Sequence, residues 1–192
     1  MPRRHAAADR ARRAVPGGRP AAGFTLIELM VTISLIVVIM ALAAPSFTAF
    51  QRNAQLTSSA NTLLSSLTAA RAEAMKRGRN VTVAPVTGSN WNSGWIVFVD
   101  EDGSGAKNGS EAVLATEPAP ESTITIETVP TGMAYVMFNG SGYPRLSGGA
   151  FQSSSIDFTH GLSSEQRRIV SSPAGRLRIC KPDATTCAAA VL

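Results

Sequence analysis

Residues 23–47 read GFTLIELMVTISLIVVIMALAAPSF, and the part from 24 to 44 is almost entirely apolar. Four polar side chains interrupt this run: Thr25, Glu28, Thr32 and Ser34. A helix of about 20 residues spans the hydrocarbon core of a bilayer, so the run is long enough to cross one. The stretch before Gly23 carries six arginines. Because basic residues favour the cytoplasmic side of a span, the pattern predicts a single pass with a cytoplasmic N-terminus and the rest of the chain outside.

The formal net charge of +5 over 192 residues belongs to the N-terminal stretch alone. The six arginines and the single acid, Asp9, before Gly23 account for all of it, and the remaining 12 basic and 12 acidic residues cancel. The net charge therefore gives no indication that the folded part of the chain binds nucleic acid. A composition of 44% hydrophobic and 16% charged residues excludes intrinsic disorder. Two cysteines exclude a disulfide-scaffolded mini-protein and a four-cysteine zinc module.

Two interpretations of the apolar run compete. The first is a cleaved secretory signal, with a basic region, an apolar core from Leu29 to Ala44 and an A-x-A cleavage site at 41–43. The second is a retained membrane helix. Glu28 at the mouth of the apolar core argues against a signal peptide, and so does the helical pattern, which continues past the cleavage site.

That continuation is an apolar stripe with spacings of 4, 3, 4, 3 and 4 residues: Leu56, Ala60, Leu63, Leu67, Ala70 and Ala74. Such spacing is typical of one helix face that packs against a core. Gly78 supplies a stop, and Lys76 and Arg77 suit the negative end of the helix dipole. We therefore expect one long helix with a membrane half at 24–44 and an amphipathic half at 45–78.

Residues 23–47 resemble the N-terminus of the type IV pilin superfamily, with its Gly-Phe-Thr-Leu-Ile-Glu processing motif and a proline at Pro45. The resemblance implies that a prepilin peptidase removes the basic leader, 1–23, by cutting after Gly23 and then methylates Phe24. An acid inside a membrane segment costs several kcal/mol unless it is paired, so Glu28 is expected to have a function. The resemblance implies that it meets the N-terminal amine of an adjacent subunit; the alternative is that it snorkels to the lipid surface.

After Gly78 the periodicity changes to alternation, which predicts a β-rich head at 79–192. The expected strands are 80–85, 94–100, 112–116, 122–129, 134–139, 154–159, 168–172 and 176–180. A long helix followed by short strands predicts an α+β fold, with the helix packed on an antiparallel β-sheet or small β-sandwich. Much of the core is expected from seven side chains: Trp95, Ile96, Phe98, Val136, Phe138, Ile156 and Phe158.

Three head segments are similar to the GspH/FimT family of minor pilins and pseudopilins: ARAEAMKRG (70–78), GWIVFVD (94–100) and RRIVSSPAGRLRIC (167–180). The resemblance implies a non-enzymatic subunit of the bacterial inner membrane with a periplasmic head. It would assemble with other pilins or pseudopilins into a type II secretion pseudopilus or a type IV pilus.

The stretch DEDGSGAKNGSE, residues 100–111, is close to a calcium-loop pattern. Asp100, Asp102, Ser104 and Glu111 fall at loop positions 1, 3, 5 and 12, so calcium is the one cofactor the sequence raises. A strand precedes the stretch, however, and no helices flank it. The competing interpretation is a solvated acidic hairpin.

The C-terminal segment is basic through Arg167, Arg168, Arg176, Arg178 and Lys181. Residues 175–178 alternate, so if they form a strand Arg176 and Arg178 point to the same face. Arginines on one strand face can bind phosphates through paired donors. In the FimT branch of the family a Gly-Arg-x-Arg motif near the C-terminus is associated with DNA uptake, and residues 175–178 match it. DNA is therefore a candidate partner. The alternative is that these side chains pair with neighbouring pilins or with the acidic segment at 100–127.

Cys180 and Cys187 lie close in sequence in a compartment expected to be oxidising, so a disulfide is the default expectation. A metal site there would need further ligands, and none cluster nearby. No catalytic residues are predicted, because the chain lacks a G-x-S-x-G motif and His160 has no evident orienting partner. A periplasmic enzyme freed by signal cleavage remains the alternative class of protein.

Overall fold

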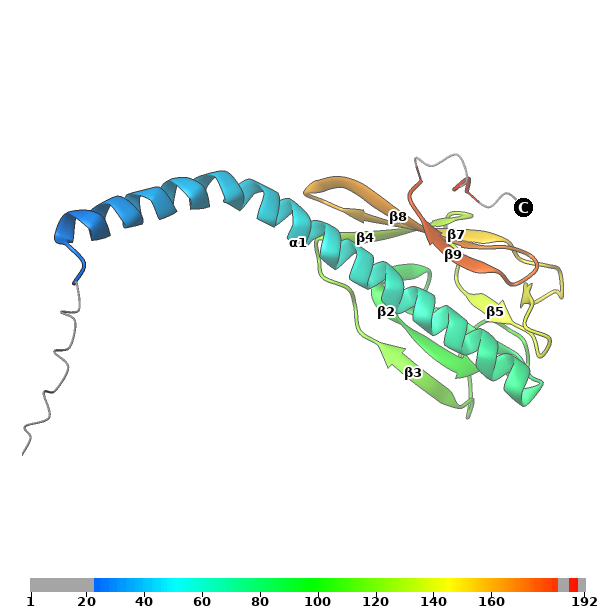
Figure 1. The fold of residues 1–192 in the computed structure, drawn as a ribbon. Coiled ribbons are helices and arrows are strands. Elements are labelled where there is room, and N and C mark those ends of the chain that lie inside the picture. Colours follow the sequence, from blue (N-terminus) through cyan, green and yellow to red (C-terminus); the bar gives the residue numbers. More distant parts are fainter. Residues whose placement is uncertain (1–22, 183–186, 190–192) are drawn as a thin grey trace, which may run out of the picture. The chain divides into compact units, whose positions relative to one another are not determined.

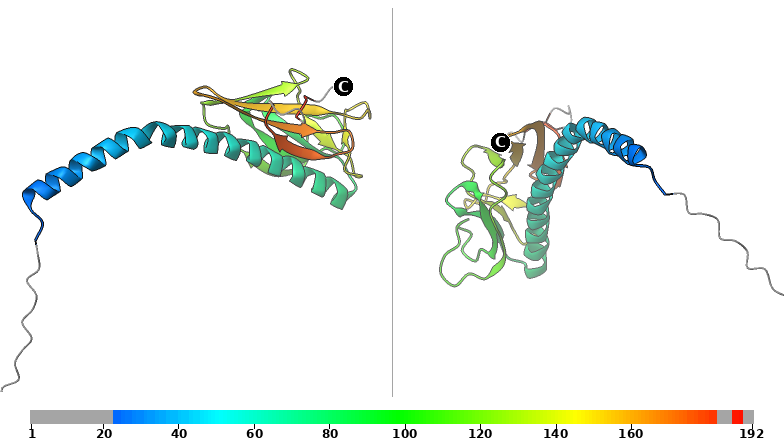
Figure 2. Two further views of the ribbon diagram at one scale, coloured as in Figure 1. Left: turned by 45° about the horizontal axis from the view of Figure 1, so that its top comes forward. Right: turned by 90° about the vertical axis from the view of Figure 1, so that its left-hand side faces the viewer.

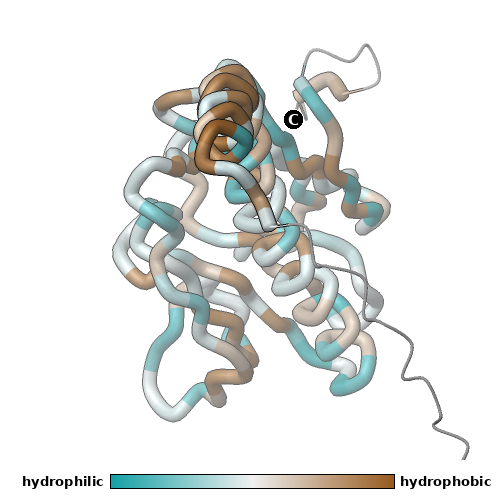
Figure 3. Tube along the Cα trace, turned by 60° about the vertical axis from the view of Figure 1, so that its left-hand side comes forward, coloured by the Kyte–Doolittle hydropathy of each residue, from teal (hydrophilic) through white to brown (hydrophobic). Residues whose placement is uncertain are grey.

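A computed structural model of the chain describes residues 23–182 and 187–189, and it divides into two compact units between Ala43 and Ala44. The described part of the first unit is the beginning of helix α1 (Leu26–Arg77). Its segment Leu26–Ala43 has a mean hydropathy of 2.7 and none of its residues is buried, so by length and composition it could cross a membrane. Figure 3 shows this segment mostly in the brown of apolar residues. The hydroxyls of Thr32 and Ser34 donate to helix carbonyls of the preceding turn, which leaves few polar groups unpaired in an apolar environment.

The second unit combines the remainder of α1 with two antiparallel sheets (Figures 1 and 2). The five-stranded sheet has the order β3-β2-β1-β5-β6, and the four-stranded sheet has the order β4-β7-β8-β9. The strands are β1 Val81–Thr87, β2 Asn90–Val99, β3 Val113–Glu117, β4 Ile124–Val129, β5 Val136–Phe138, β6 Pro144–Arg145, β7 Ser154–His160, β8 Ser163–Ser171 and β9 Leu177–Cys180. The α+β architecture predicted from the sequence is confirmed.

All eight predicted strands are present, and three main details differ from prediction. Strand β2 begins at Asn90 and not at Gly94. The short strand β6 was not predicted, because two residues carry no measurable alternation. Strand β8 begins at Ser163 and not at Arg168, since it pairs with β7 as far as the hairpin end. The additional residues are polar, so hydrophobic alternation could not reveal them.

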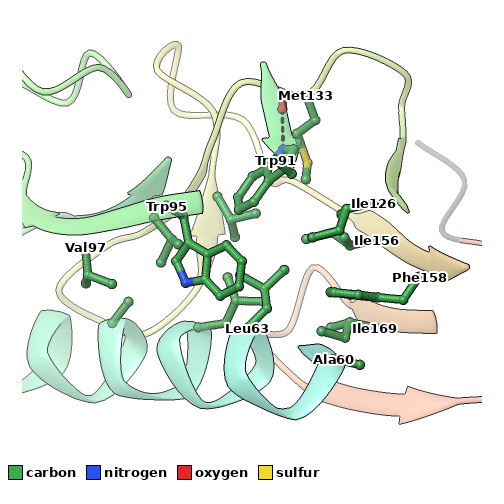
Figure 4. Close-up of a cluster of buried hydrophobic side chains, with 14 of the residues drawn as sticks. Ala60, Leu63, Trp91, Trp95, Val97, Ile126, Met133, Ile156, Phe158 and Ile169 are labelled. Atoms are coloured by element: carbon green, nitrogen blue, oxygen red, sulfur yellow. Dashed lines mark hydrogen bonds between the residues drawn. The ribbon is translucent and has the colours of Figure 1, made fainter. Parts of the chain in front are cut away.

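The predicted apolar stripe of the helix lies at the centre of the hydrophobic core. All six of its members are at most 1% exposed, and they pack with apolar side chains from both sheets. Figure 4 shows Trp95 of the five-stranded sheet and Phe158 of the four-stranded sheet above the same helix. Trp95 Nε1 donates to Ser66 Oγ at 3.0 Å, so the buried indole is satisfied by the helix it packs on. Of the seven predicted core residues only Ile96 is partly exposed, because it alternates with Trp95 and Val97 and faces outward.

One side chain joins the two sheets. The amide of Asn92 in β2 donates to the carbonyl of Ile126 at 3.3 Å and accepts the N–H of the same residue at 2.9 Å. Asn92 therefore pairs with β4 as a neighbouring strand would, and it satisfies backbone groups at the edge of the four-stranded sheet.

Candidate functional sites

The N-terminal motif stands at the beginning of α1. Gly23 and Phe24 precede the helix, and the Phe24 side chain is 83% exposed. Thr25 Oγ1 accepts the N–H of Glu28 at 3.2 Å, which is half of a T-x-x-E capping box. Glu28 lies in the first helical turn, where negative charge favours the helix dipole. None of the ion pairs among the described residues involves Glu28.

The acidic loop after β2 brings three predicted ligands together. Carboxylate oxygens of Asp100, Asp102 and Glu111 lie within 4.8 Å of one another. Each of their six oxygens already accepts a hydrogen bond from the protein. Buried Asp100, for example, accepts from the Thr82 hydroxyl at 2.8 Å and from two loop amides. The fourth predicted ligand, Ser104, directs its hydroxyl to the carbonyl of Ala106.

These bonds give the loop a defined pH dependence. Hydrogen bonds from Asn108 and Ser104 lower the pKa of Asp102 from 3.8 to about 2. Because this pKa is lower in the folded protein, the charged carboxylate stabilises the loop above pH 3.8, and the contribution is lost as the pH falls through about 2. We expect the amide NMR signals of Ser104 and Asn108 to titrate with a midpoint near 2. A midpoint at the ordinary value of 3.8 would contradict the bonding described.

Calcium binding by this loop stays a prediction. A bound cation would have to displace donors such as the Asn108 amide, which is 3.0 Å from Asp102 Oδ2. A calcium titration of the melting temperature of the full chain, with magnesium as the matched control, checks it.

Three of the five basic residues in the C-terminal segment are in ion pairs within the head. Arg168 makes a two-pronged contact with Asp157, at 2.5 and 2.6 Å, which raises the pKa of its guanidinium. Lys181 and Arg167 both contact Glu165, at 2.7 and 3.1 Å, and in that order they lower the pKa of this carboxyl. These partners come from β7 and β8 and not from the acidic segment at 100–127.

The remaining two, Arg176 and Arg178, have no ion-pair partner among the described residues. Arg178 lies in β9 opposite Val170, whereas Arg176 precedes the strand. Because Arg176 lies outside β9, the alternation of a strand does not place its side chain on the same face as that of Arg178. Arg176 is exposed, and its backbone N–H is held by Ser172 Oγ at 3.1 Å.

The predicted disulfide between Cys180 and Cys187 is present. Cys187 is completely buried, and its carbonyl accepts a hydrogen bond from Arg168 at 3.1 Å. The disulfide and Arg168 thus fasten the same C-terminal residue to strands β8 and β9. His160 has a local structural contact, because its Nδ1 accepts the N–H of Leu162 at 3.1 Å in the β7–β8 hairpin.

Arg71 makes a contact that no sequence pattern indicates, on the face of α1 beside two loops. Its Nε donates to the carbonyl of Gly142 at 2.9 Å. The partner is 71 residues away in sequence, so no local signal could have indicated the contact.

The chain combines a methylation motif with a long helix whose second half packs on two antiparallel sheets. This combination defines a pilin-like protein. The model of the prokaryotic N-terminal methylation motif matches residues 18–44. The family model described as type II transport protein GspH matches residues 59–175, more than half of the chain, and the chain belongs to this GspH family.

Solved structures of low sequence identity share the fold. The type IV minor pilin FimU of Pseudomonas aeruginosa is 19% identical, with a TM-score of 0.57 over 72% of this chain and 98% of that one. The minor pseudopilin EpsH from the type 2 secretion system of Vibrio cholerae is 13% identical, with a TM-score of 0.51 over 68% of this chain and 99% of that one. A comparison with curated protein sequences gave no match.

Proposed function

We propose that the chain is a minor pilin or pseudopilin subunit that enters a filament through α1 after a prepilin peptidase cleaves behind Gly23 and Phe24 is methylated. The observation that carries this proposal is the methylation motif at the start of an exposed apolar segment whose helix continues into the core of the head. An apolar segment with no cover of its own requires lipid or other helices around it. Membership of the GspH family and the absence of a predicted catalytic arrangement favour a structural role over an enzymatic one.

Before assembly the subunit would lie in the bacterial inner membrane, with the leader, residues 1–23, cytoplasmic until its removal and the head periplasmic. The arginine-rich flank supports this orientation through the positive-inside rule. The disulfide supports an oxidising compartment for the head, because such bonds persist in the periplasm and are rare in the cytosol.

Intact-mass and N-terminal analysis of the protein extracted from membranes tests the proposal. We expect a chain that begins with methylated Phe24, and we expect Gly23→Glu to accumulate uncleaved. A mature protein that begins at Ala44 and lacks the apolar segment would overturn the proposal in favour of a secretory signal.

A second candidate function is DNA binding, and the unpaired charges of Arg176 and Arg178 favour it. Binding would be directed to the phosphate backbone and would weaken steeply with salt. We expect the double variant Arg176→Ala/Arg178→Ala to reduce DNA affinity at low salt by about tenfold, since each lost phosphate contact removes a counterion-release contribution. The matched control is Arg79→Ala, whose exposed side chain pairs with Glu101. Equal affinities of the double variant and the parent chain would exclude this function for the two arginines.

A further inference from the structure

A small pocket lies between α1 and the turn that joins β8 to β9. Its volume is about 280 Å³, and its lining residues are Thr68 and Arg71 from the helix and Ala174, Arg176 and Leu177 from the turn and β9. Figure 2 shows the β8–β9 hairpin beside the second half of α1. Two guanidinium groups line the pocket, and no carboxylate does.

The helix side of the pocket is fixed in place. Arg71 is half-buried, and its Nε is committed to the carbonyl of Gly142. Gly175 has a φ of +76°, and a Cβ atom there would overlap the Gly142 carbonyl oxygen and approach Arg71 Nε to 3.1 Å. Only glycine therefore lets the turn pack this closely on the guanidinium. Among the described residues, the terminal nitrogens of Arg71 make no hydrogen bond, so they can donate to a ligand.

The turn side is equally well defined. Ser172 accepts the N–H of Gly175 through its carbonyl at 2.8 Å and the N–H of Arg176 through its hydroxyl at 3.1 Å. The backbone of Arg176 is thus held while its side chain stays exposed and makes no ion pair among the described residues. Because the backbone of the turn is already ordered, binding a ligand costs entropy only for ordering the Arg176 side chain.

Within the part of the chain that the structure describes, neither arginine of the pocket has a carboxylate partner. Four other arginines of the described chain have a carboxylate partner: Arg77, Arg79, Arg167 and Arg168. Arg71 and Arg176 instead share one small pocket with each other. Two like charges in one pocket repel, and an anion between them offsets both. The planar fork of a guanidinium matches the geometry of carboxylate and phosphate oxygens.

We propose that this pocket binds a single oxyanion group, a phosphate or a carboxylate, between Arg71 and Arg176. Thr68 forms a wall and not a donor, because its hydroxyl proton is directed to the carbonyl of Leu64 at 2.7 Å. The volume is too small for a drug-sized ligand, so the pocket takes one group and not an extended molecule. The site depends neither on filament assembly nor on the alignment of Arg176 with Arg178.

The test is a titration of the full chain in detergent, followed by the backbone amide NMR signals of Ser172 and residues 174–177. Inorganic phosphate and acetate are the probes, and sodium chloride at matched ionic strength is the baseline. We expect saturable shifts with at least one probe; phosphate alone points to a phosphate ligand, and both point to a site that also accepts a carboxylate. Shifts no larger than those with chloride overturn the proposal.

Single substitutions test whether the guanidinium groups of Arg71 and Arg176 both contribute to binding of the probe. We expect Arg176→Ala to weaken binding of the probe by about tenfold, the loss of one charge-assisted contact. Arg178→Ala is the matched control, because Arg178 does not line the pocket, and it should change the affinity less than twofold. Arg71→Lys keeps the charge and loses the fork, and we expect a weakening of several-fold without unfolding. An unchanged affinity in Arg176→Ala overturns the proposal even if the parent chain binds.

Discussion

Replacing Glu28 with glutamine is expected to abolish incorporation of the subunit into filaments while membrane insertion and cleavage behind Gly23 continue. An ionised acid within a membrane segment costs several kcal/mol unless it is paired. A cationic amine of a neighbouring subunit would remove that cost in the assembled state only. Glutamine has no charge to pair, so the preference for assembly disappears. We expect at least a tenfold fall in the ratio of filament-bound to membrane-bound subunit, measured in fractionated cells.

The capping contact at the start of α1 makes glutamine the informative substitution. Glu28 occupies the N3 position, the last residue of the T-x-x-E box, and glutamine is accepted there as well as glutamate. Glu28→Gln therefore retains the local helix start and removes only the charge. Thr25→Ala is the converse control, because it removes the hydroxyl that accepts the Glu28 N–H and keeps the charge. If Thr25→Ala fails to assemble and Glu28→Gln assembles normally, Glu28 is a capping residue and the intermolecular pairing is wrong.

The features that could be predicted from the sequence are those with a local period. The stripe from Leu56 to Ala74 repeats every three or four residues, and the structure buries it completely. The strands alternate where one face meets the core, as in β4, and the predicted and observed bounds of β4 and β7 agree to within two residues. The disulfide was predictable because the two cysteines lie seven positions apart and leave no competing pairing.

The features that could not be predicted depend on which segments meet. Arg168 and Asp157 face each other because β7 and β8 pair in one particular register. Arg71 contacts Gly142 because a loop folds back on the end of the helix. The C-terminal basic residues form one cluster when only their positions along the chain are considered. In three dimensions they separate into Arg168 on Asp157, Arg167 and Lys181 on Glu165, and two unpaired arginines.

Replacing Asp157 with alanine is expected to lower the free energy of unfolding by about 2–4 kcal/mol, below the full cost of breaking a completely buried pair. The Arg168 and Asp157 side chains are only 15% and 18% exposed, so the substitution leaves a largely desolvated guanidinium without its partner. Glu101→Ala is the matched control, because its pair with Arg79 is more than 60% exposed on both sides. Such surface pairs contribute about 0–1 kcal/mol. Denaturant unfolding of the full chain in detergent measures both, and equal effects would mean that the Arg168 contact adds nothing beyond a surface pair.

The same contact should be coupled to the disulfide. Arg168 donates to the carbonyl of Cys187, and the disulfide ties that residue to the end of β9. Removing a disulfide that closes a short loop costs about 2–3 kcal/mol in the chain-entropy account. In Cys180→Ser/Cys187→Ser the C-terminal residues are no longer tied to β9, so the Cys187 carbonyl no longer covers Arg168 and water can reach the guanidinium. Asp157→Ala should then cost less than it does in the parent chain, giving a coupling energy of about 1 kcal/mol. Additive losses would show that Arg168 and the disulfide hold the C-terminal segment independently.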